Sequence, residues 1–161
     1  MRRTTIMKHL LILCLLTSLF AFAAVDPVSS QKLELKPGWN LVTLTQPIAN
    51  ESATLFLSLK PMMLDTKNKC YVRCTRKDDI KVGVGYWIFS RTAQPPIDLV
   101  HDQSQTNWET ATLTQGWNLI GVANNSTWMP KATDIWQWLN GKFQTITKEE
   151  LTTGEAYWVK Q

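Results

Sequence analysis

Few side chains in this 161-residue chain could perform redox or nucleophilic chemistry. Two of them are Cys70 and Cys74, which lie four residues apart in the segment KCYVRC. Cysteine pairs in exported proteins usually form disulfides. However, four residues of extended strand span roughly 13 Å, which exceeds the reach of a disulfide. A Cys70–Cys74 bond therefore requires a turn or bulge between the two residues. The alternatives are separate thiols, or a redox or nucleophilic pair.

Acid–base catalysis has equally few candidate groups. A Ser-His-Asp arrangement would depend on His101, which has Asp98 and Asp102 nearby in a polar segment. A solvated loop histidine is the simpler interpretation. The adjacent carboxylates of Asp78-Asp79 and Glu149-Glu150 would point to opposite faces of a strand, so they do not predict a converging pair. With so few histidines and cysteines, we expect no metal site, no cofactor and no enzymatic activity.

Tryptophan is unusually frequent in the chain, which contains eight of these residues. Trp108 and Trp128 occur in polar, loop-like sequence. Indoles in such positions can stack on a sugar ring or on a side chain of a partner protein. These two residues are therefore the candidate ligand-binding positions. The alternative is that they cover apolar edges of a sheet.

A repeated pattern predicts the elements that must position these side chains. Residues 38–41 and 116–119 both read GWNL, and GYWI at 85–88 and AYWV at 156–159 follow in the same order. We predict two tandem pseudo-symmetric units, at 25–92 and 109–161, joined by a polar linker at 93–108 that contains Pro95-Pro96. Because about 55 residues bury little surface alone, the units are expected to share one core in one compact domain.

Each unit is predicted to contain a strand, a short helix or loop, a β-hairpin and a closing strand. The expected fold class is therefore mainly β with a minor α component. Segment 51–60 is predicted to be a helix capped by Asn50 or Ser52, and segment 62–74 a hairpin that turns around Lys67-Asn68. The asparagine of each GWNL motif is expected to hydrogen-bond the backbone of its turn, since an unpaired buried amide is costly.

The second hairpin has the clearest local signal. Asn140-Gly141 is a favoured two-residue turn, and it predicts that Trp136, Trp138 and Phe143 share one face of the segment 135–146. These rings either belong to the core or form a ligand platform. The tryptophans of the repeated motifs recur by position, which predicts a shared place in the core. They are Trp39, Trp87, Trp117 and Trp158.

The opening GWNL and closing YW-[IV] motifs resemble tandem modules of many bacterial exported and surface proteins. In those modules GWNL begins a unit and YWV ends it. The resemblance covers nearly all of the chain after its N-terminal segment. It implies a mostly β, extracytoplasmic module that often accompanies larger envelope proteins and has no assigned activity. This chain differs from that pattern by the extra cysteine-containing loop in its first unit.

The N-terminus predicts export. Residues 1–24 combine Arg2, Arg3 and Lys8 with a short apolar run and the small-x-small pattern Ala21-Phe22-Ala23, which is typical of a cleaved signal peptide. The alternative is an uncleaved N-terminal anchor. Cleavage would change the formal net charge from +4 to 4 − 3 = +1. We therefore do not expect nucleic-acid binding. We also expect no stable membrane span after cleavage, and a periplasmic, cell-surface or extracellular location.

Three functions remain open on these grounds. The first is an exported non-catalytic module that binds or scaffolds at the cell envelope, through contacts with a glycan or another exported protein. The second is a secreted inhibitor-like protein that presents the Cys70–Cys74 loop. The third is a small exported enzyme that uses these cysteines or His101.

Overall fold

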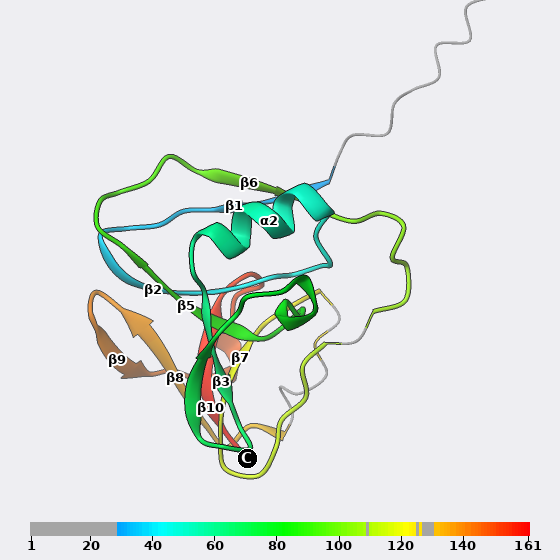
Figure 1. The fold of residues 1–161 in the computed structure, drawn as a ribbon. Coiled ribbons are helices and arrows are strands. Elements are labelled where there is room, and N and C mark those ends of the chain that lie inside the picture. The colour runs from blue at the N-terminus through cyan, green and yellow to red at the C-terminus, as the bar shows by residue number, and fades with distance from the viewer. Residues whose placement is uncertain (1–28, 109, 125, 127–130) are drawn as a thin grey trace, which may run out of the picture.

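The structure is a computed structural model that describes residues 29–108, 110–124, 126 and 131–161 (Figure 1). The described residues form ten β-strands in three antiparallel sheets and one α-helix. The prediction of a mainly β fold is therefore confirmed. The predicted signal peptide at 1–24 lies outside the described residues.

The first four-stranded sheet has the strand order β2-β5-β3-β4. Its strands are β2 (Gly38–Thr43), β3 (Met62–Asp65), β4 (Cys70–Arg73) and β5 (Gly85–Ser90). The predicted hairpin is present, because β3 and β4 pair from Met62↔Arg73 to Asp65↔Cys70. Its turn requires a positive φ of 55° at Lys69.

The second four-stranded sheet has the strand order β7-β10-β8-β9. Its strands are β7 (Trp117–Gly121), β8 (Asp134–Leu139), β9 (Lys142–Thr145) and β10 (Ala156–Lys160). The predicted register of the second hairpin is confirmed, with Leu139 opposite Lys142 and Trp138 opposite Phe143. Asn140 and Gly141 have φ values of 52° and 78°, as a type I′ turn requires.

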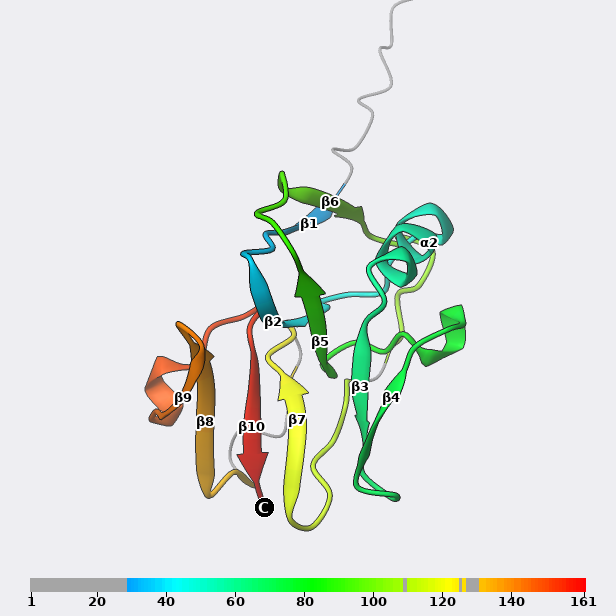
Figure 2. The same cartoon turned by 60° about the vertical axis from the view of Figure 1, so that its left-hand side comes forward.

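The third sheet pairs β1 (Ser30–Leu33) with β6 (Ile97–Val100) and lies next to the helix α2 (Asn50–Ser58), as Figures 1 and 2 show. Strand β6 lies within the segment expected to be a linker, and its Leu99 is fully buried. The helix matches the prediction, but its N-cap residue is Ala49 and no side chain caps it. Ser52 Oγ instead accepts a hydrogen bond from the Val100 backbone N–H, which ties the helix to β6.

Buried apolar side chains form two clusters rather than the single core that the sequence predicted. One cluster packs the first sheet against α2 and β6 around Phe56, Tyr86 and Leu99. The other covers one face of the second sheet around Ile120 and Tyr157. Each tyrosine hydroxyl accepts a backbone hydrogen bond from five residues earlier, at 2.6 Å for Tyr86 and 2.9 Å for Tyr157. In each cluster, a backbone hydrogen bond to the hydroxyl therefore fixes the position of the buried tyrosine ring.

The two large sheets touch closely at one end (Figure 2). The Gly121 N–H donates to the Gly83 carbonyl at 2.7 Å, and the buried Thr43 side chain packs directly against the Gly121 backbone. A side chain at Gly85 would likewise meet Leu119. Glycines at this joint let the two backbones approach closely. The two sheets are therefore in direct contact, although each has its own buried cluster.

Candidate binding site

The predicted core position of the motif tryptophans is wrong for two of them. Trp39 is 48% exposed and Trp117 is 40% exposed, whereas Trp87 is buried and Trp158 is half-buried. Strand alternation explains this result. Tyr86 and Tyr157 point into the two interiors, so the adjacent tryptophans must point to the opposite faces of their sheets.

The opposite faces of both sheets are rich in aromatic rings. In the first sheet, Trp39 pairs with Phe89. In the second, Trp158 pairs with Trp136, which continues the row toward the β8–β9 hairpin. Side chains directly opposite each other across a strand pair lie on the same face. Two aromatic faces therefore diverge from the joint at Thr43 and Gly121.

A groove of about 440 Å³ lies between these faces. A smaller hollow of about 230 Å³ adjoins it and shares Phe143 and Trp158 with it. We call the two together the aromatic groove. Six of the seven tryptophans among the described residues line it, and Trp108 is the exception. Its lining residues are Trp39, Met62, Tyr71, Trp87, Trp117, Trp136, Trp138, Phe143 and Trp158.

The rings in the groove contact one another edge to face. The Trp87 and Trp138 centroids, from different sheets, are 5.2 Å apart with planes at 86°. Trp138 and Phe143 are 4.8 Å apart at 64°, and Trp39 and Trp87 are 6.2 Å apart at 86°. Such contacts stabilise the groove by about 0.5–1.5 kcal/mol per pair beyond area burial. The ring contacts thus hold the lining residues in place relative to one another.

Most polar groups of the groove already have partners. The Trp138 indole N–H donates to the Trp39 carbonyl at 3.1 Å, which links the two sheets. The Trp87 indole N–H donates to the Tyr71 hydroxyl at 3.1 Å. Burial raises the pKa of Tyr71, and its interactions with the Trp87 and Trp158 indoles only partly offset that rise. Tyr71 therefore stays protonated at neutral pH.

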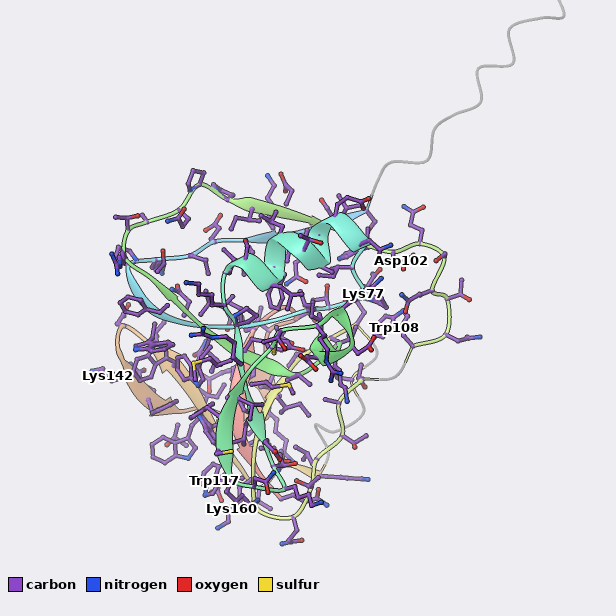
Figure 3. The ribbon with its side chains drawn as sticks, in the orientation of Figure 1. Lys77, Asp102, Trp108, Trp117, Lys142 and Lys160 are labelled. Atoms are coloured by element: carbon purple, nitrogen blue, oxygen red, sulfur yellow. The ribbon has the colours of Figure 1, made fainter. Side chains whose placement is uncertain are left out.

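Cations flank the aromatic groove. Arg73 pairs with Met62 in the first sheet, and Lys160 pairs with Trp117 in the second, so each shares a face with groove residues. Figure 3 shows Lys160 next to Trp117. Both cations are exposed, and neither forms an ion pair within the part of the chain that the structure describes. Asp134 pairs with Lys160 in register, but at more than ion-pair distance.

Trp108 does not contribute to this groove. It lines a separate cavity of about 510 Å³ together with Lys77, Lys81 and Gln105. Figure 3 shows it near Lys77, on the side of the molecule away from Lys142. The other predicted position, Trp128, lies outside the described residues. Sequence reasoning therefore missed the groove. The available signal was the shared face predicted for Trp136, Trp138 and Phe143, for which a ligand platform was one interpretation.

The two cysteines are separate thiols in the structure. Cys70 is exposed at the start of β4, and Cys74 is buried just beyond the end of that strand. The extended strand between them keeps the thiols apart, as the four-residue spacing requires. Burial raises the pKa of Cys74 to about 11, and the Asp79 carboxylate adds to the rise. Cys74 is therefore neutral and unreactive at physiological pH.

The exposure of Cys70 and the burial of Cys74 predict how fast each thiol reacts in the protein lacking residues 1–24. At pH 7.5 we expect Ellman's reagent to modify one thiol rapidly in the native state and a second only after unfolding. The Cys70→Ser variant should lose the fast reaction and keep the slow one. Absence of any reactive thiol before a reductant is added would instead reveal a Cys70–Cys74 disulfide.

His101 contacts a serine, but no carboxylate orients its ring among the described residues. Its Nδ1 lies 2.9 Å from the Ser29 hydroxyl, and its buried Nε2 has no hydrogen-bond partner among the described residues. The Asp102 carboxylate accepts from Ser104 and Gln105 instead. Burial lowers the pKa of His101 and keeps it neutral at pH 7. The imidazole thus tethers β6 to the segment before β1.

No group of three or more metal-ligating side chains converges among the residues that the structure covers. Within the same residues, no helix has the length and apolar character needed to cross a bilayer. Comparison of the chain with protein-family models, curated proteins and solved structures yields no significant match. The aromatic groove is therefore the main structural lead to a function.

Proposed function

We propose that the protein is an exported, non-catalytic module that binds a segment of another envelope protein in the aromatic groove. The observation that carries this proposal is the gathering of six tryptophans around one open groove. Contiguous exposed apolar surface of this kind marks interaction sites in soluble proteins. The volume of the groove also falls within the range of small-molecule binding sites.

The polar groups of the groove favour a protein ligand over a glycan ligand. A sugar ring can stack on an indole, but its hydroxyls must also find donors and acceptors. In this groove the Trp39 carbonyl and the Tyr71 oxygen already accept hydrogen bonds. Apolar side chains of a polypeptide would bury area against the rings without that requirement. Enrichment in tryptophan is itself typical of protein-binding hot spots.

We also propose that the two four-stranded sheets are copies of one duplicated unit. Both have the same strand order when their strands are numbered within each unit. Asn40 and Asn118 make matching hydrogen bonds to the backbone four and two residues earlier. The tyrosines Tyr86 and Tyr157 make the same bond to the fifth residue before them. A duplicated unit would explain why two aromatic faces are available to form one groove.

Binding through the groove can be tested with two variants of one hairpin. Phe143 and Leu139 are similarly exposed, at 40% and 39%, but strand alternation places only Phe143 on the groove face. Peptides would be selected from a random phage-displayed library on the protein lacking residues 1–24. Phe143→Ala should weaken their binding roughly 30-fold, the effect of a hot spot worth ~2 kcal/mol. Leu139→Ala should leave it unchanged.

Thermal melts of both variants would confirm that the fold persists. Peptides that bind both variants equally would contradict the proposal. Retention of the protein on peptidoglycan or an N-acetylglucosamine polymer, lost in Phe143→Ala, would reassign the groove to glycans.

A further inference from the structure

The lining of the aromatic groove is almost wholly apolar, and its few unpaired polar groups are hydrogen-bond donors rather than free acceptors. An indole can only donate, whereas a hydroxyl has one hydrogen and two acceptor positions. The Tyr71 oxygen accepts from the Trp87 indole. Its own hydrogen therefore remains to be donated, and no described residue accepts it. The exposed indole of Trp39 likewise has no acceptor within the described part of the chain.

A segment buried in such a groove must present acceptors and as few donors as possible. Each backbone N–H of an ordinary peptide would lose water without gaining a partner, which costs affinity. A proline-rich segment avoids this cost, because proline has a carbonyl but no N–H. In the polyproline II conformation its carbonyls are free of internal hydrogen bonds. The donor-only lining and this backbone are therefore complementary.

The arrangement of the rings also suits proline. The indoles of Trp87 and Trp138 stand nearly perpendicular, as do those of Trp39 and Trp87, so the groove presents both ring faces and ring edges to an occupant. A pyrrolidine ring is compact, apolar and rigid, and it can pack against such a surface with little loss of conformational entropy. Aromatic-lined grooves that recognise polyproline II segments use the same physical match.

We propose that the occupant of the aromatic groove is a proline-rich segment of the partner protein, bound in the polyproline II conformation with carbonyls accepting from the Tyr71 hydroxyl and the exposed Trp39 indole. This inference rests on the proposed function. The exposed cations Arg73 and Lys160 flank the groove without ion pairs, so the segment should carry acidic residues beside its prolines.

A pair of synthetic peptides tests the inference. One is a blocked oligoproline with an aspartate at each end, and the other has alternate prolines replaced by alanine, which restores N–H donors. Binding would be followed by tryptophan fluorescence with the protein lacking residues 1–24. The oligoproline should bind with a Kd on the order of 1 mM or tighter. It should bind about tenfold more tightly than the alanine-containing peptide.

The Tyr71→Phe variant keeps the ring and removes the hydroxyl. It should weaken oligoproline binding about fivefold, because one buried hydrogen bond is lost. Leu139→Ala serves as the control and should bind like the parent protein. If Tyr71→Phe lowers the melting temperature sharply, the peptide comparison on the parent protein decides alone.

The outcomes separate this inference from the proposed function. Equal binding of both peptides, abolished by Phe143→Ala, would overturn proline recognition and leave a general peptide groove. No oligoproline binding at millimolar concentration, with library peptides that still require Phe143, would do the same. A Phe143-dependent preference for a chitooligosaccharide over either peptide would overturn both. Self-association of the unliganded protein that Phe143→Ala abolishes would replace the separate partner with a second copy of this chain.

Discussion

The Gly121→Ala variant is expected to lose about 3 kcal/mol or more of its free energy of unfolding. A methyl group on residue 121 would overlap the side chain of Thr43. Thr43 cannot move aside, because it is fully buried and its hydroxyl donates to the Val84 carbonyl at 2.7 Å. Relief therefore requires the two sheets to separate at their joint, where the Gly121 N–H bonds the Gly83 carbonyl.

Urea denaturation of this variant and two others would check the expectation. Gly116→Ala is the matched control, because Gly116 precedes the same strand and a Cβ there meets nothing within 4 Å. Its φ of 89° still makes alanine unfavourable by roughly 1–2 kcal/mol. Thr43→Gly in the Gly121→Ala background should recover part of the loss, as expected for contacting residues. Equal costs at positions 116 and 121 would contradict a tight joint.

The Asn118→Ala variant is expected to lose about 3 kcal/mol. The Asn118 side chain is buried, and its oxygen accepts from the backbone N–H and hydroxyl of Thr114 at 2.9 and 2.8 Å. Its amide nitrogen donates to the carbonyls of Thr114 and Gly116, both at 2.8 Å. Alanine would leave these backbone groups unpaired in a place that water does not easily reach.

Asn40 provides the comparison within the same chain. It makes equivalent bonds to Lys36 and Gly38 at 2.8–3.1 Å, but it is only half-buried. Water can replace its bonds, so Asn40→Ala should cost only about 1 kcal/mol. The difference in urea midpoints between the two variants measures the effect of burial. Similar losses at both sites would show that solvent access does not control the energy of this turn.

Local signals in the sequence predicted local structure well. The Asn140-Gly141 turn specified the pairing of Trp138 with Phe143, and the GWNL asparagines bond their turns as expected. The helix at Asn50–Ser58 was also predicted, although its capping residue was not. These features depend on a few neighbouring residues. A sequence pattern can therefore specify them without knowledge of the rest of the fold.

The candidate site could not be predicted in the same way, because it depends on how two sheets meet. Alternation along β5 fixes that Tyr86 and Trp87 face opposite sides, but it does not say which side becomes the interior. The choice follows from α2 and β6, which cover the Tyr86 side through Phe56 and Leu99. The Trp87 side then faces the second sheet, and the angle at the joint leaves a groove. The repeated tryptophan motif therefore suggested a shared core, whereas its rings line a groove between the two sheets.

The perpendicular indoles of the groove also have an optical consequence. Trp87 and Trp138 lie 5.2 Å apart, and Trp117 and Trp158 lie 6.2 Å apart at 79°. Transition dipoles at such distances and angles couple as excitons and give paired circular dichroism bands of opposite sign. The amplitude depends steeply on ring separation, so any occupant that wedges between the rings changes the spectrum. The protein thus carries a built-in, label-free reporter of whether its groove is filled.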